Sequence, residues 1–462
     1  MQMRAAIKLV PRPLSASSLV TSTMGMLSTV AMLLAVVLLP ASSALAAGDA
    51  NTPACPAATE TSSGWDASLP DCRAYELVSP PDSGDLSSVG SAYGFSGHFV
   101  YKSKLPTPVE GTPAGDPEEF LATRTAEGWR QTPLTVPQGE AAVEGNYGNF
   151  DTGGVMFTGD FSDALVMAPF QVPLESPRLD ETTGTMVYDL SLSSGAISTV
   201  SLPDSGKLTQ GMIEFPTVYR GEHGAKESGW GSFLAGASQD GSRIFFSTTA
   251  RLPTAAGTPA DTHQTSAELY ERTAGHTYLV GVLPDGEVPA CGAEVGQSGR
   301  STAETGFEGY AYGAIAPDGS NVVFRTPGER PQGAACTERE TGVFLRNVVT
   351  GTTVKLPGGY VGGGTKTPAG YAGRAGTQPG EEEKIFTVEG TESAGGKIFE
   401  YHVATGQTVE VASEAKGLLA YSASGARVYY LGPEGLIYLY EEGAPAPRLV
   451  PGGYGAERYN PT

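Results

Sequence analysis

Few residues of the chain have both the type and the spacing of a catalytic or metal-binding group. The five histidines are scattered, and no two have the i, i+4 spacing that places two imidazoles on one helix face around zinc. Three fall in segments expected to be strands, where an imidazole packs or meets water: His98, His276 and His402. His223 and His263 fall in expected loops and are the two that could coordinate an ion.

Two short segments come close to the Gly-x-Ser-x-Gly turn that exposes the nucleophile of an α/β-hydrolase. In Gly94–Gly97 and in Gly296–Gly299 the second glycine comes one residue too early. Both segments lie where a turn or loop is expected, so we interpret them as structural. No catalytic residue is predicted from them.

The acidic residues that stand close together in the sequence do not form an obvious pair. Neighbouring side chains of a strand point to opposite faces, which separates Glu118 from Glu119 and divides the run Glu381–Glu383. A carboxylate pair for glycoside hydrolysis would have to come from distant segments. The loop Ala260–Gln264 and the pair Asp180-Glu181 offer oxygen ligands for Ca²⁺, but without an EF-hand pattern. No cofactor is predicted, and Ca²⁺ is the open alternative.

The four cysteines predict disulfides. Their number is even, and no Cys-x-x-Cys pair indicates a metal site. Proximity in the sequence favours Cys55–Cys72 and Cys291–Cys336. In the chain-entropy treatment these bridges would contribute about 3 and about 4 kcal/mol.

The N-terminus has the three parts of a secretory signal peptide. Arg4, Lys8 and Arg12 precede the apolar run Met24–Leu39, and Ala44-Leu45-Ala46 supplies the small residues of a cleavage site. We therefore expect residues 1–46 to be a signal peptide and the mature chain to be secreted or held in the cell envelope. The apolar run is short for a membrane helix, which favours the signal peptide. An uncleaved anchor is the alternative, and it is the one expected route to a membrane.

Composition and charge narrow the class of protein. The formal net charge is −21, which disfavours binding to nucleic acid. Glycine and proline are abundant, at 62 and 34 residues, but 20 tyrosines and 16 phenylalanines argue against a disordered chain. Turn formers between short aromatic and β-branched runs indicate an all-β fold.

One unit recurs along the chain: a turn, a strand, a variable loop, and two strands joined by a glycine hairpin. In the clearest copy, Ala237–Arg243 is the turn, Ile244–Ser247 the strand, and Thr273-Ala274-Gly275 the hairpin. A Pro-Asp-Gly turn suits this role, because Pro fixes φ, Asp bonds its own backbone and Gly accepts a positive φ. The blade-turn residues of the copies are Asp163, Asp240, Gly241, Asp318, Gly319 and Gly425.

These units predict an all-β fold, a β-propeller of about six four-stranded antiparallel blades preceded by the signal peptide. Residues 47–87 would be a cysteine-containing segment with a ring-closing strand at Ala74–Val78, and residues 88–462 the propeller. The expected blades are 88–137, 148–206, 229–290, 310–359, 371–415 and 417–462. The long polar loops are expected at Pro106–Pro117, Pro173–Thr185, Pro253–Ala267 and Pro327–Thr341.

The turns resemble those of the TolB-type (WD40-like) six-bladed propeller family, whose hallmark is Ser-Pro-Asp-Gly-Ser-x-Ile-x-Phe. Ala316–Phe324 matches it well, and Ser238–Phe246 matches it except for Gln239 in place of proline. Leu69–Pro81, which contains LPDCRAYELVSP, resembles a motif that opens a group of secreted actinobacterial propeller proteins. The resemblance implies the fold and an extracytoplasmic location, and no settled activity.

We therefore expect a monomeric extracytoplasmic scaffold that is not an enzyme. Its loops would bind an envelope or extracellular partner, either a protein, a peptide or a glycan. The alternative is a propeller glycosidase or lyase, with carboxylates of separate blades converging in the central funnel.

Overall fold

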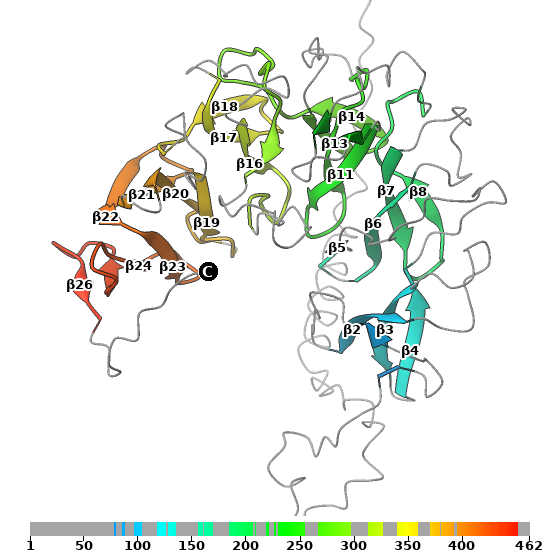
Figure 1. Ribbon diagram of the computed structural model, residues 1–462, viewed down its shortest axis with the longest axis horizontal. Coiled ribbons are helices and arrows are strands. Elements are labelled where there is room, and N and C mark those ends of the chain that lie inside the picture. The colour runs from blue at the N-terminus through cyan, green and yellow to red at the C-terminus, as the bar shows by residue number, and fades with distance from the viewer. Residues whose placement is uncertain are drawn as a thin grey trace, which may run out of the picture. The chain divides into compact units, whose positions relative to one another are not determined.

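The structure is a computed structural model. It describes residues 78–79, 86–87, 97–103, 118–125, 128–134, 156–159, 161–169, 184–206, 208, 219–220, 226–227, 230–254, 267–296, 313–326, 340–358, 370–378, 380–391 and 395–450. The described strands form six four-stranded units, which confirms the predicted all-β propeller fold (Figure 1).

The first three units, here called blades 1, 2 and 3, have these bounds. Blade 1 is β1 (Leu86–Ser87), β2 (His98–Ser103), β3 (Glu118–Thr125) and β4 (Gly128–Pro133). Blade 2 is β5 (Met156–Phe157), β6 (Asp163–Pro169), β7 (Gly184–Ser191) and β8 (Ile197–Thr199). Blade 3 is β11 (Trp230–Ala237), β12 (Arg243–Thr248), β13 (Glu268–Thr273) and β14 (His276–Leu279).

Blades 4, 5 and 6 repeat the same antiparallel order. Blade 4 is β15 (Glu294–Val295), β16 (Asn321–Thr326), β17 (Gly342–Asn347) and β18 (Thr352–Lys355). Blade 5 is β19 (Gly370–Ala375), β20 (Lys384–Thr391), β21 (Gly395–His402) and β22 (Thr408–Ala415). Blade 6 is β23 (Gly417–Tyr421), β24 (Arg427–Leu431), β25 (Ile437–Glu441) and β26 (Arg448–Leu449).

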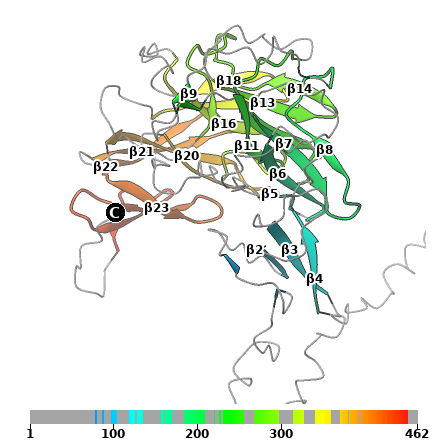
Figure 2. The same ribbon diagram turned by 45° about the vertical axis from the view of Figure 1, so that its right-hand side comes forward.

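Three details were not expected from the sequence. β11 pairs in parallel with β7 at Trp230 and Gly231, which joins blades 2 and 3 along one edge (Figure 2). A two-stranded hairpin, β9 (Tyr219–Arg220) and β10 (Lys226–Glu227), precedes blade 3. Blade 4 begins at Glu294 rather than near residue 310. Two separate segments pair with the same edge of β16: β15 pairs with its second half, and Ile315 forms a bridge to Val322 in its first half.

The chain forms two compact units. Of the described residues, the first unit contains 78–79, 97–98, 122–125 and 128–130, and the second contains the others. Blades 2 to 6 therefore lie in the second unit.

Within the second unit, blades 3, 4 and 5 each pack their two faces on two different neighbours. Along β16, Val322 and Phe324 join a core cluster with Phe245 of blade 3, whereas Val323 joins a cluster with Ile385 of blade 5. Next to Ile385, Phe386 joins Val428 of blade 6. This alternation follows from the period of two in a strand, and a fully buried phenylalanine contributes about 2–3 kcal/mol.

The turn before the second strand has the same hydrogen-bond pattern in blades 3, 4 and 6. In blade 3 the Gly241 N–H donates to Ser238 O (3.0 Å) and the Ser238 N–H donates to Arg243 O (2.9 Å). Blade 4 repeats the second of these bonds from Ala316 to Asn321 O (2.8 Å), and blade 6 repeats it from Ser422 to Arg427 O (2.8 Å). The turn glycines have positive φ, at +69° in Gly241, +70° in Gly319 and +75° in Gly425.

The turn of blade 2 departs from the expected assignment. Phe161 has the positive φ (56°) that glycine has in the other turns, and its N–H donates to Thr158 O (3.0 Å). Asp163 is not in the turn but is the first residue of β6, opposite Ser191. It therefore corresponds to Arg243 of blade 3 and not to a turn aspartate.

Main-chain hydrogen bonds link the turns of neighbouring blades. The Gly159 N–H donates to Gln239 O (2.6 Å), and the Gln239 N–H donates to Pro317 O (2.6 Å). Between blades 5 and 6 the Gly376 N–H donates to Ala423 O (2.7 Å). The turn ends of these blades therefore lie together.

Candidate functional site

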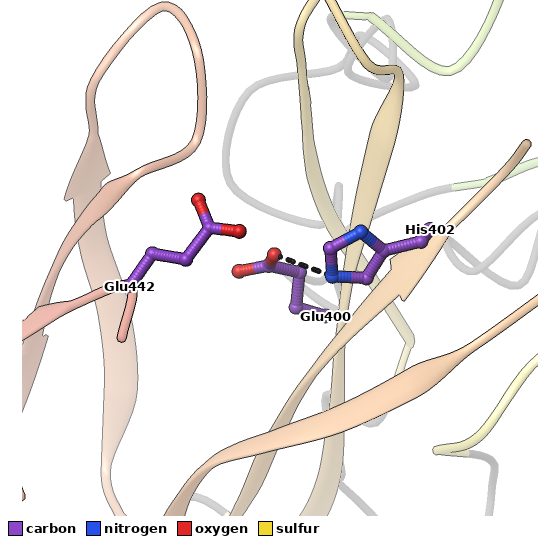
Figure 3. Close-up of side chains that lie close together, drawn as sticks. All are labelled: Glu400, His402 and Glu442. Carbon is purple, nitrogen blue, oxygen red and sulfur yellow. Dashed lines mark ion pairs between the residues drawn. The ribbon is translucent and has the colours of Figure 1, made fainter. Parts of the chain in front are cut away.

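The described residues contain one cluster with metal-ligand chemistry, formed by Glu400, His402 and Glu442. One ligand atom from each lies within 4.8 Å of the other two. Glu400 and His402 are two residues apart on β21 and share one face of the strand, while Glu442 directly follows β25 of the next blade (Figure 3). His402 Nε2 lies 3.0 Å from Glu400 Oε1.

A second carboxylate holds the other nitrogen of the imidazole. His402 Nδ1 lies 3.1 Å from Glu382 Oε1, in the turn before β20. A carboxylate behind a histidine is an arrangement that orients metal-binding imidazoles. The geometry around His402 therefore resembles part of a metal centre.

Lys384 decides what this cluster can do. Its Nζ lies 3.0 Å from Glu400 Oε1 and 2.8 Å from Glu442 Oε2, so an ammonium ion stands between the two carboxylates. Burial alone would lower the pKa of Lys384, but hydrogen bonds from its ammonium group to Glu442 and Glu400 raise it overall. A charged lysine in this position competes with a divalent cation, and we interpret the cluster as an ion-pair network that joins blades 5 and 6.

A second buried cation joins blades 4 and 5. Arg374 of β19 donates from Nη2 to Ala314 O (2.8 Å) and to Asn321 O (3.3 Å), and it also pairs with Glu383. Burial lowers the pKa of Arg374 to about 10, which leaves it charged at neutral pH. This arginine lies where the main-chain bond between turns is missing, because Pro317 has no N–H to donate to blade 5.

The blade-turn residues predicted from the sequence have structural partners. Asp240 Oδ1 accepts hydrogen bonds from Ser238 Oγ (2.7 Å) and from the Ser242 N–H (3.1 Å) and Oγ–H (2.8 Å), and the Ser238 bond is the main cause that lowers the pKa of Asp240. Burial alone would raise the pKa of Asp318, but hydrogen bonds from the Ser320 N–H (2.9 Å) and Oγ–H (2.7 Å) lower it. These carboxylates close their own turns.

The turn glycines also fit against the preceding blade. A Cβ on Gly241 would lie 2.7 Å from Thr158 Cγ2, and one on Gly319 would lie 2.7 Å from Arg243 Cδ. A Cβ on Gly425 would lie 2.9 Å from Lys384 Cδ. Gly241, Gly319 and Gly425 are therefore required both by the turn and by contact between blades.

The remaining candidate residues are dispersed. His98 Nδ1 lies 3.2 Å from Thr123 Oγ1, and burial lowers the pKa of His98. His276 Nδ1 lies 2.9 Å from Asp204 Oδ2. Ser96 and Ser298, the serines of the two segments interpreted as structural turns, lie outside the described residues, as do His223 and His263.

Only one of the four cysteines in the predicted disulfides lies within the described residues. Cys291 is fully buried and is not a free thiol, whereas Cys55, Cys72 and Cys336 lie outside the described residues. The Ala290 N–H donates to Glu340 Oε1 (2.9 Å). Ala290 directly precedes Cys291, and Glu340 comes four residues after Cys336, so this bond brings the two cysteine-containing segments near each other. The pairings stay predictions, as do the signal peptide and the ring-closing strand, which lie mostly or wholly outside the described residues.

Sequence reasoning missed the network around Lys384. The i, i+2 spacing of Glu400 and His402 could have placed both on one strand face, but Lys384 and Glu442 are 58 residues apart and meet only through the packing of two blades.

No helix in the described part of the chain is long and apolar enough to cross a membrane.

No model of a known protein family matches the chain, and no curated protein matches it. Three similar solved structures are a prolyl endopeptidase (13% identity, 78% of this chain, 42% of that chain, TM-score 0.37), TolB of Acinetobacter baumannii (14%, 75%, 61%, TM-score 0.29), and the β-propeller domain of the trilobed protease of Pyrococcus furiosus (8%, 77%, 94%, TM-score 0.23). The chain thus spans less than two thirds of the first two. The six four-stranded blades themselves carry the fold assignment.

Proposed function

We propose that the chain is an extracytoplasmic scaffold of the TolB-like kind. It would bind an envelope or extracellular partner, which is a protein, a peptide or a glycan, at the end of the blades that carries the long connections. The expected signal peptide at residues 1–46 supports the location, and the distribution of connection lengths supports the binding end.

The four long polar loops predicted from the sequence have the same place in their blades. Residues 104–117, 170–183, 249–267 and 327–341 each join the second strand of a blade to the third, in blades 1, 2, 3 and 4 respectively. In blades 5 and 6 the same connection has only the few residues between β20 and β21 and between β24 and β25. In an antiparallel sheet these connections leave from the end opposite the tight turns.

The turn end is occupied by structure. Its aspartates close the turns, and its glycines and main-chain bonds join one blade to the next, so it has little freedom to vary. Long surface connections on a rigid scaffold are where binding residues are most often found. The uneven loop lengths therefore favour blades 1 to 4 as the binding side.

The test uses the chain from residue 47 onward with two loops shortened. Replacing 255–266 and 327–335 by short Gly-Ser linkers should remove binding to a panel of immobilised cell-wall glycans and extracellular proteins, while the thermal unfolding midpoint stays within a few degrees. The second deletion spares Cys336. A control insertion of the same Gly-Ser linker at Ser194, in a hairpin of the turn end, should leave binding intact.

Two results would contradict the proposal. One is binding that survives both deletions but is lost with the insertion at Ser194. The other is turnover of a glycoside, polysaccharide or peptide by the intact chain, which would favour the glycosidase or lyase alternative.

A further inference from the structure

One diagonal position between the second and third strands carries an ion pair in two blades. In blade 3, Arg243 is opposite Thr273, and it contacts Glu271, which is opposite Phe245. In blade 5, Lys384 is opposite His402, and its Nζ lies 3.0 Å from Glu400, which is opposite Phe386. Diagonal residues of an antiparallel pair share one face of the sheet and are within reach of each other.

Blade 2 has two acids at the same position. Asp163 is opposite Ser191, and Asp189 is opposite Leu165, so the register places Asp163 where Arg243 and Lys384 stand and Asp189 where Glu271 and Glu400 stand. The negative charge of Asp163 acts on Asp189. The cation of blades 3 and 5 is thus replaced by a second carboxylate in blade 2.

The surroundings of this pair supply no compensating cation among the described residues. Burial and the charge of Asp163 are the causes that act on Asp189, and no cation is among them. The strands packed most closely on β6 and β7 are β5, β8 and β11, and none of these three contains a charged residue. In blade 3, Arg272 donates to Leu202 O (3.2 Å) and to Thr277 Oγ1 (2.8 Å), and Asp204 is held by His276 and Arg272.

Hydrogen bonding also leaves the pair short of a donor. Asp163 Oδ2 accepts a hydrogen bond from Ser162 Oγ (2.5 Å), but the buried Oδ1 of Asp189 has no hydrogen-bond partner among the described residues. Burial first, and then the charge of Asp163, raise the pKa of Asp189 to about 6. A proton on the Asp189 carboxyl would remove its repulsion by the charge of Asp163.

We propose that Asp163 and Asp189 form a pH-sensitive element of blade 2, in which the Asp189 carboxyl holds a proton in mildly acidic surroundings and is repelled by the Asp163 carboxylate when that proton is lost. The native state then holds a proton that the unfolded chain has already released. The contribution of Asp189 to stability is therefore greatest below about pH 4, where both states are protonated. It falls as the pH rises through the window up to about 6. In a secreted or envelope protein, blade 2 would be tighter in acidic surroundings than at neutral pH.

The test compares the unfolding midpoint of the mature chain and of its variants between pH 4.5 and 7.5. A shift of two pKa units would change the unfolding equilibrium by at most about 100-fold, and partial exposure of Asp189 reduces the expectation to about tenfold between pH 5 and 7. Asp189→Asn should remove this dependence and should slow hydrogen exchange in β6 and β7 at pH 7, with little difference at pH 5. Asp163→Asn should reduce the dependence without abolishing it.

Asp163→Arg provides the sharpest contrast, because it restores the pair that Arg243 and Glu271 form in blade 3. Its stability should be flat between pH 5 and 7. Glu414→Gln is the matched control: it removes one acid from an exposed strand position and should keep the wild-type pH profile. A profile unchanged by Asp189→Asn, or equal changes in Asp189→Asn and Glu414→Gln, would overturn the proposal. If Asp163→Arg does not fold, the two asparagine variants still decide it.

Discussion

The main-chain N–H of Gln239, in the turn of blade 3, donates a 2.6 Å hydrogen bond to the carbonyl oxygen of Pro317 in the equivalent turn of blade 4. The TolB-type hallmark, to which this turn is similar, has proline at the place of Gln239. A proline there could not make this bond.

Replacing Gln239 by proline should therefore destabilise the protein, although proline suits the turn itself. The loss of one hydrogen bond is expected to cost about 1 kcal/mol, measured by urea unfolding. The control is Ala423→Pro at the equivalent position of blade 6. The Ala423 N–H donates no main-chain bond within the described residues, so this substitution should be neutral or slightly stabilising. Equal effects of the two substitutions would contradict the role of the bond between turns.

Arg374 should be the most sensitive position at the junction of blades 4 and 5. Its buried guanidinium serves Ala314 O, Asn321 O and Glu383 where Pro317 cannot donate. Arg374→Leu would leave Glu383 without its cation and the carbonyl groups without donors, at an expected cost of about 3–5 kcal/mol in chemical denaturation. Adding Glu383→Gln to Arg374→Leu should recover part of this loss. A double variant as unstable as the sum of its single changes would show that the pair is not coupled.

Substituting Gly319 tests whether crowding between blades lowers stability beyond the backbone strain of the turn. Gly319→Ala places a methyl group 2.7 Å from Arg243 Cδ at a φ of +70°, so both strain and crowding oppose it. Gly275 has a φ of +82° with nothing within 4 Å of the added Cβ, and Gly275→Ala isolates the backbone cost. We expect about 1 kcal/mol for Gly275→Ala and 1–2 kcal/mol more for Gly319→Ala, as estimates from thermal unfolding. Equal losses would mean that Arg243 moves aside freely.

Lys384 tests the interpretation of the cluster in Figure 3. Lys384→Met removes the ammonium group between Glu400 and Glu442, and the uncompensated buried charge should cost about 3 kcal/mol or more. The control, Lys397→Met, breaks the exposed pair with Glu410 and should change stability little.

The same variant tells a lysine network from a metal centre. Millimolar Zn²⁺ should leave the unfolding midpoint of the wild type unchanged and should raise that of Lys384→Met, because only the variant frees the carboxylates for a cation. An equal rise in the wild type, abolished by His402→Ala, would show that the native cluster binds zinc.

The fold class could be predicted because its signals are local and repeated. A Gly-containing turn followed by β-branched and aromatic residues marks the second strand, as in Arg427–Leu431, which is β24 as expected. β15 could not be found in this way. Glu294–Val295 is a two-residue strand separated from its turn, and only the edge of β16 gives it a partner.

The candidate site was far less predictable than the fold. Asp163 was assigned to a turn because the turn of blade 2 has no glycine to mark it. Phe161 takes the positive φ there, and a phenylalanine gives no sequence signal for that conformation. Glu400 and Lys384 depend on the register of β20 and β21, and a shift of one residue would separate them. Register is set by the whole sheet and its neighbours, which a short motif does not contain.

The fit of each turn glycine against the preceding turn has a consequence for how such a chain can change over time. Gly319 fits against Arg243, and Gly425 fits against Lys384. Each repeat therefore supplies one side of a contact between blades, and the repeat before it supplies the other side. Duplicating or deleting one repeat by recombination would bring together sides that were never matched. The heritable module is therefore the boundary between two blades, and length should vary first in the connections that take no part in these contacts.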